Sequence, residues 1–158
     1  LLKALSLAKK KLNFNLILIG SGIEKNNLEK YIIQNNLNNN IKIINYIKNP
    51  YPLLRKSDVF ILTSRYEGLP NVLLEAMVLN KLIISSDCPT GPKEILLKGK
   101  AGILFKNGDY YDLYKKIINL KNRKKNNKKM IILARKSLYR FNSNLNLNKY
   151  YNLCKKFL

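Results

Sequence analysis

Five short segments of the chain consist almost entirely of isoleucine, leucine, valine and phenylalanine. They show little alternation with polar residues, which is typical of strands buried on both faces of a parallel sheet. Between them lie segments with helical spacing, such as the one carrying Leu28, Tyr31 and Ile32. This order predicts an α/β fold with a Rossmann-like, doubly wound parallel sheet. We expect the strands at 15–19, 41–45, 59–63, 81–85 and 101–105.

Beyond residue 105 only helical spacing recurs. Leu113, Ile117 and Leu120 define one expected helix, residues 131–138 a second and residues 147–157 a third. A chain of 158 residues is long enough for one domain with its own core. We therefore expect a single domain over 1–158, with a β/α core over about 1–105 and a helical tail over 106–158.

Charge changes this picture. The chain has 30 Lys and Arg against 9 Asp and Glu, and its formal net charge is +21. Such a surface attracts anionic partners. The alternative source of the charge is a coding bias towards Lys, Asn and Ile, which the asparagine-rich tract at 35–40 favours. The basic segment at 121–129 suits phosphate or lipid headgroups, and it equally suits a solvated turn or helix face.

The sequence lacks the residues and motifs that several kinds of chemistry require. The chain has no His, and Cys88 and Cys154 form no paired motif, so the sequence predicts neither a metal site nor a Ser-His-Asp triad, and it indicates a reducing compartment. No GxxxxGK[ST] loop or DxD pair occurs, which argues against a P-loop ATPase and a Mn²⁺-dependent site. No apolar run reaches the roughly 18 residues of a membrane span. We expect a cytoplasmic protein, with peripheral attachment to the inner face of the membrane as an alternative.

The scarce acidic residues gather in one part of the chain. Pro70 suits the first turn of a helix that carries Leu73, Ala76 and Met77, and the preceding loop directly follows the third expected strand. This places the loop at the carboxyl end of a strand, where open α/β sheets bind ligands. Five of the nine acidic residues lie between positions 58 and 94, namely Asp58, Glu67, Glu75, Asp87 and Glu94.

This loop has the groups that a phosphorylated sugar would need. The free N–H groups at the start of the helix, from about Asn71 to Leu73, face an incoming phosphate. Glu67 and Glu75 flank that position, and a carboxylate accepts two hydrogen bonds side by side from a vicinal diol. The alternative is structural, with Glu67 stabilising the helix start and Glu75 on a solvated helix face.

The turn Gly20-Ser21-Gly22 after the first expected strand would let the backbone approach a phosphate closely. The full GxGxxG pattern is not met because position 25 is Lys. A simple tight turn is the alternative interpretation.

These residues carry a resemblance to a known family. Glu67-Gly68, followed at position 75 by a second Glu, resembles the signature of the retaining GT-B glycosyltransferases of family 4. The strand and glycine turn at 16–22 and the segment at 45–60 resemble the family's C-terminal, donor-binding half in the right order. The loop at 86–95 is similar to that of members which extend lipid-linked or envelope polysaccharides.

The resemblance implies a nucleotide-sugar donor site without a metal or other cofactor. Glu67 would contact the donor sugar near the reacting centre, and Glu75 would hold the ribose hydroxyls. Transfer of a hexosyl or N-acetylhexosaminyl group, with retention, to a cell-envelope glycan or lipid-linked acceptor is the implied activity, and a UDP-sugar is the implied donor. Further contacts are implied for Gly68, Leu69, Pro70, Asn71 and Val72 at the diphosphate, Tyr46 and Ile47 beside the base, and Gly20, Ser21 and Gly22 along the cleft.

The resemblance also implies parts that lie outside this sequence. The family's first strand of this half, with its Arg and Lys, should come just before Leu1, and the N-terminal acceptor domain should precede it. We therefore expect residues 1–158 to bind a nucleotide weakly and not to transfer sugar. Asn80 stands where many members have Gly, which a polar turn residue can accommodate. A basic nucleic-acid-binding module is the competing hypothesis, but aromatic and basic residues alternate only around 149–151, which argues against it.

Overall fold

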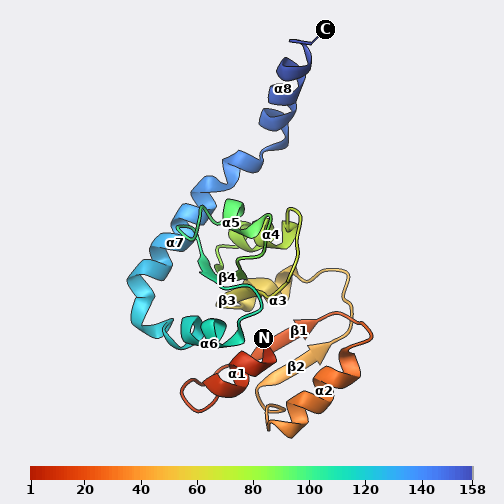
Figure 1. Cartoon of the computed structure of the whole chain (residues 1–158), viewed down its shortest axis with the longest axis vertical. Helices are drawn as coiled ribbons and strands as arrows, with labels where there is room; N and C mark the ends of the chain where they lie inside the picture. Colours follow the sequence, from red (N-terminus) through yellow and green to blue (C-terminus); the bar gives the residue numbers. More distant parts are fainter. Residues whose placement is uncertain (158) are drawn as a thin grey trace.

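The computed structural model describes residues 1–157, and parallel strands form its centre (Figure 1). One sheet pairs β1 (Leu16–Ile19) with β2 (Ile41–Ile44), and the other has the order β3 (Val59–Leu62), β4 (Leu82–Ser86), β5 (Ile103–Phe105). The helices are α1 (Leu2–Ala8), α2 (Lys25–Gln34), α3 (Tyr51–Lys56), α4 (Asn71–Val78), α5 (Pro92–Ile95), α6 (Tyr110–Ile118), α7 (Lys124–Ser137) and α8 (Ser143–Cys154), with short 3₁₀ helices η1 (Lys121–Arg123) and η2 (Leu138–Phe141).

The predicted α/β fold with parallel strands and flanking helices is confirmed. All five expected strands are present, with ends that differ from the expected ones by two residues at most. The strands form two sheets instead of one, because β1 and β3 have no hydrogen-bonded strand neighbour on one side among residues 1–157. Periodicity also overestimated one helix, since Leu120 lies beyond the end of α6.

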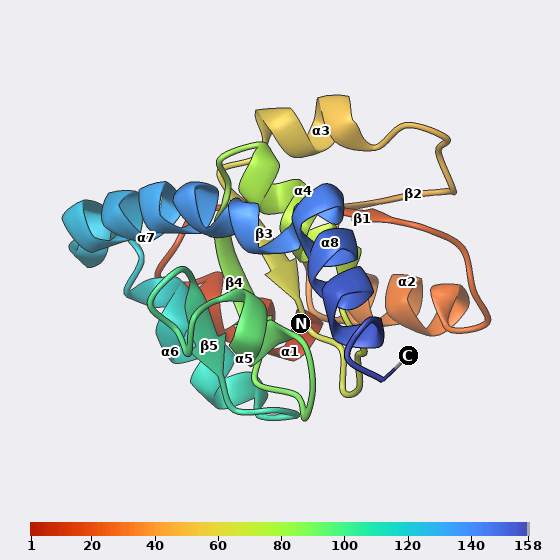
Figure 2. The ribbon, with the colours of Figure 1, turned by 90° about the horizontal axis from the view of Figure 1, so that it is seen from above.

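Alternate residues of β4 face two separate apolar clusters. Ile84 belongs to a cluster with α1, α6 and residues of both sheets, and Ile83 belongs to a second cluster with α4, α5 and Ala134 of α7. All five residues of β4 are buried. Helices therefore cover both faces of this sheet, as a doubly wound architecture requires. In both views α1 lies between α6 and α2, so the first cluster connects the two sheets (Figures 1 and 2).

Local chemistry sets several element ends. The Asp109 carboxylate caps α6 by accepting hydrogen bonds from the N–H groups of Asp112, at 2.9 Å, and Tyr111, at 3.0 Å. These bonds, the Asp112 one foremost, hold the pKa of Asp109 below its usual value because they favour the charged carboxylate. Asn80 follows α4 with a φ of +56°, a left-handed conformation that asparagine tolerates, which is consistent with its expected place in a turn.

The helices after β5 differ in how they pack. Ala134 of α7 is buried in the second cluster, and the Arg135 guanidinium donates a hydrogen bond to the Val78 carbonyl at 2.8 Å. By contrast, α8 has no buried residue and extends away from the rest of the molecule (Figure 1). The expected helical segments are therefore present, and α7 forms part of the packed body.

Candidate donor-binding site

The loop between β3 and α4 carries the largest group of predicted site residues. It lies at the carboxyl end of β3 and leads directly into α4, as the sequence predicts. Leu73, Ala76 and Met77 are fully buried and fix α4 against the sheet. Glu75 lies on the partly exposed side of the same helix. The burial of one face of α4 therefore sets where the other face presents its carboxylate.

The first turn of α4 offers fewer free donors than the sequence indicates. The N–H of Leu73 donates to the Pro70 carbonyl at 3.0 Å, so it is already paired. The N–H groups of Asn71 and Val72, the first two helical residues, have no backbone acceptor in the described chain. These two groups are therefore the donors that the start of this helix could offer to an anion.

Neither predicted carboxylate is engaged within the protein. Glu67 and Glu75 are half-buried. Among residues 1–157 their side-chain oxygens make no hydrogen bond and no ion pair. Both carboxylates keep their accepting capacity for the hydroxyl groups of a ligand.

The glycine turn after β1 lines a pocket of about 300 Å³. Gly20 has a φ of +140°, which side chains rarely adopt, and its N–H donates to the Ile44 carbonyl of β2 at 2.9 Å. Three predicted site residues, Gly20, Ser21 and Gly22, therefore line the same pocket. The pocket is lined by Leu18, Ile19, Gly20, Ser21, Gly22, Glu24, Lys25, Leu28 and Ile43.

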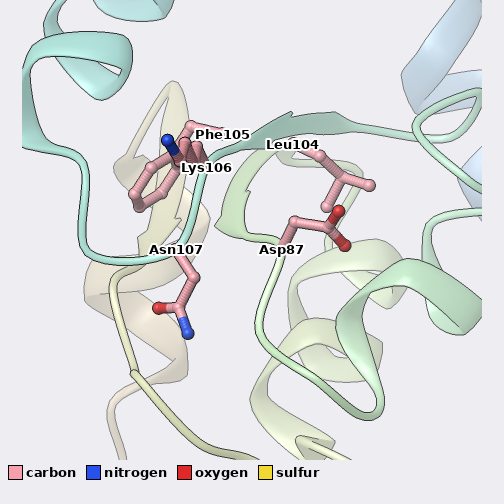
Figure 3. Close-up of a pocket in the computed structure, with 5 residues that line it drawn as sticks. All are labelled: Asp87, Leu104, Phe105, Lys106 and Asn107. Carbon is pink, nitrogen blue, oxygen red and sulfur yellow. The ribbon is translucent and has the colours of Figure 1, made fainter.

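The structure has a second pocket, of about 450 Å³, which the sequence analysis does not predict. It is lined by Asp87 at the end of β4 and by Leu104, Phe105, Lys106 and Asn107 of β5 and its continuation (Figure 3). The Asp87 carboxylate lies 3.4 Å from the Lys93 ammonium. The sequence signal that could have predicted this pocket is the position of its polar residues, which directly follow two strands of a parallel sheet.

The structure does not gather every predicted residue into one cavity. Glu67 and Glu75 line neither pocket, and the two pockets share no residue. Tyr46 and Ile47 lie in the loop between β2 and α3, where the Tyr46 side chain is 75% exposed. In residues 1–157 no group of three or more potential metal-ligating side chains occurs. None of the helices within that range combines the length and apolarity that a membrane crossing requires.

A family model described as glycosyl transferases group 1 matches residues 1–137. The chain belongs to this family. Within it, an uncharacterized glycosyltransferase of Methanocaldococcus jannaschii is 46% identical over 84 residues, which are 53% of this chain and 21% of the relative. The lipopolysaccharide 1,6-galactosyltransferase of Escherichia coli K12 is 33% identical over 113 residues, which are 69% of this chain and 31% of the relative.

A solved structure has the same fold. The structure of a Staphylococcus aureus TarM mutant in complex with Fondaparinux, alpha-GlcNAc-glycerol and UDP superposes with a TM-score of 0.86 at 26% identity. The match covers 96% of this glycosyltransferase chain and 31% of the TarM chain. The chain therefore spans less than a third of the length of each of these three relatives.

Proposed function

We propose that residues 1–158 bind the nucleotide-sugar donor of a group 1 glycosyltransferase and that the nucleotide is UDP. The observation that carries this proposal is the loop and helix start at 67–75, where two carboxylates and two helix N–H groups have no partner among residues 1–157. Glu75 would hold the ribose hydroxyls, and Glu67 would contact the donor sugar near the reacting centre. The UDP bound in the TarM structure supports the choice of nucleotide.

The remaining contacts follow from the positions of the loops. The diphosphate would lie on the backbone of residues 68–72, where the dipole of α4 adds partial positive charge. Tyr46 and Ile47 would border the uracil, and the Gly20 turn would line the cleft. Backbone N–H groups and basic side chains would stabilise the departing diphosphate, so the proposed site uses no metal. Glu67 is proposed as a contact to the sugar and not as a base.

Sugar transfer itself is proposed for the longer protein. The relatives are three or more times the length of the matched segment, and an acceptor would occupy a part that these residues do not include. We propose retaining transfer of a hexosyl or N-acetylhexosaminyl group to a cell-envelope glycan or lipid-linked acceptor. The lipopolysaccharide named for the E. coli relative supports this acceptor class.

Calorimetric titration with UDP, UDP-N-acetylglucosamine and GDP tests the donor site. We expect UDP species to bind, and we expect Glu75→Gln to weaken UDP by about tenfold or more, because the amide accepts fewer hydrogen bonds and carries no charge. Glu29→Gln is the matched control, since Glu29 is an exposed helix carboxylate that pairs only with Lys25. A folded Glu75→Gln variant that binds UDP like the unchanged chain would contradict the assignment.

We also propose attachment to an anionic membrane surface through the basic segment 121–129. Its lysines and arginine are exposed, and within the described residues none forms an ion pair. Each such charge contributes about 1 kcal/mol of attraction close to an anionic bilayer. The residues concerned are Lys121, Arg123, Lys124, Lys125, Lys128 and Lys129.

Co-sedimentation with phosphatidylglycerol-containing vesicles tests this attachment. Changing four lysines to glutamine at 124, 125, 128 and 129 should reduce vesicle binding at least about tenfold, because the local attraction is removed. Unchanged binding by this variant would contradict the proposal. Preferential binding to duplex DNA, without any response to UDP, would instead favour the nucleic-acid alternative. The control variant removes the same amount of charge elsewhere on the surface, by changing the exposed Lys10, Lys11, Lys30 and Lys42 to glutamine.

A further inference from the structure

Three side chains hold the backbone of the Glu67 loop from one side. The Ser86 hydroxyl, at the end of β4, donates to the Ser64 carbonyl at 2.6 Å. The Thr90 hydroxyl, in the loop after β4, donates to the Glu67 carbonyl. The Asn107 amide, two residues after β5, donates to the Arg65 carbonyl at 2.9 Å. Donors from two neighbouring strand ends therefore converge on one short loop.

These bonds fix the orientation of three peptide groups. In a planar trans peptide the carbonyl of one residue and the N–H of the next point in opposite directions. With their carbonyls held on the β4–β5 side, the N–H groups of Arg65, Tyr66 and Gly68 point to the opposite side. In the described part of the chain these three N–H groups have no hydrogen-bond acceptor. They are three unpaired donors on one short loop, and unpaired backbone N–H groups are the donors that bind anions in backbone nests.

Of the three donors, Ser86 is buried, Asn107 is half-buried and Thr90 is exposed. Ser86 is fully buried, so its hydroxyl needs a partner inside the protein, and the Ser64 carbonyl is that partner. The Oδ1 atom of Asn107 is inaccessible to solvent and has no partner among residues 1–157. The hydrogen bond that the Asn107 side chain makes within these residues is the one that its Nδ2 donates to the Arg65 carbonyl.

We propose that Ser86, Thr90 and Asn107 are positioning residues for the donor diphosphate. They do not touch the donor; they hold three carbonyls of the 64–67 loop away from it, so that the N–H groups of Arg65, Tyr66 and Gly68 face the anion. This rests on the proposed donor function. It assigns a role to residues outside the 67–75 segment.

Comparing UDP with uridine by ¹H–¹⁵N NMR titration separates this role from general stability. Ser86→Ala should weaken UDP about fivefold to tenfold and leave uridine affinity within about twofold, because only the diphosphate uses these donors. Thr90→Val should act in the same way, and Thr90→Ser should restore UDP affinity to within about twofold. Ser137→Ala is the matched control, since the buried Ser137 hydroxyl donates to a helix carbonyl at 2.9 Å, outside the loop.

The outcomes distinguish the two proposals. If the unchanged chain binds UDP and the Ser86→Ala and Thr90→Val variants bind it equally well, the positioning role is wrong and the donor site stands. An equal loss of UDP and uridine affinity, matched by Ser137→Ala, would also overturn the positioning role. If the unchanged, folded chain binds no UDP, the donor site and the positioning role both fail.

Discussion

Gly91→Ala should lower the free energy of unfolding by about 3 kcal/mol or more and abolish UDP binding. Gly91 has a φ of +85°, which a residue with a side chain rarely adopts. A Cβ there would overlap the Gly68 carbonyl oxygen and lie 2.6 Å from Pro70 Cδ. The alanine would therefore push the loop before α5 away from the loop that carries Glu67. Urea denaturation together with a UDP titration measures both effects.

Gly22→Ala is the control for the stability effect of this substitution. A Cβ at Gly22 would meet nothing within 4 Å, and its φ lies outside the left-handed range. We expect a change in unfolding free energy of less than about 0.5 kcal/mol for this variant. If Gly91→Ala unfolds at the same urea concentration as the unchanged chain and still binds UDP, the contact between the two loops is not structurally important.

Ile84→Ala should cost about 3 to 4 kcal/mol of unfolding free energy. Ile84 is fully buried in β4, where it is aligned with Ile61 of β3 and with Ile103 of β5. Truncation leaves a cavity between the sheet and the helices of the first cluster, which β4 cannot close because it is paired on both sides. Since small domains unfold at about 5 to 15 kcal/mol in total, this variant should melt far below the unchanged chain.

Thermal and urea unfolding of Ile84→Ala are best compared with Ile23→Ala. Ile23 is 95% exposed, so its truncation removes little buried surface. We expect less than about 0.5 kcal/mol for that control. A loss below about 1 kcal/mol for Ile84→Ala would indicate that the first cluster is loosely packed and does not join the two sheets.

The strands and most helices could be predicted because their signals are local. A short run of β-branched and apolar residues such as 59–62 favours a strand, which is half-buried here, and the burial of Leu73, Ala76 and Met77 follows from their spacing. Strand pairing is not local. No sequence pattern indicates that β1 pairs only with β2, because pairing depends on which chain segments are available to lie beside each edge.

The sequence likewise predicts one part of the candidate site and leaves another part open. Glu67 and Glu75 could be found because carboxylates are rare in this chain and these two fall at a strand end and in the following helix. The bond from Leu73 to Pro70 could not be found, since a helix start can close in more than one way. Ser86, Thr90 and Asn107 are ordinary polar residues in sequence. That all three donate to carbonyls of the 64–67 loop is known only once the fold has placed the ends of β4 and β5 side by side.

The unpaired edges of β1 and β3 bear on how copies of this chain meet one another. Ile17 and Ile19, on one face of β1, remain more than 40% exposed, and a strand edge that is unpaired among residues 1–157 invites a neighbouring chain to add to it. The net charge of +21 opposes such contact by repulsion between copies. That repulsion reaches about 8 Å at physiological ionic strength and about 3 Å in 1 M salt. Concentrated salt therefore removes most of the repulsion that keeps copies of this strongly basic chain apart.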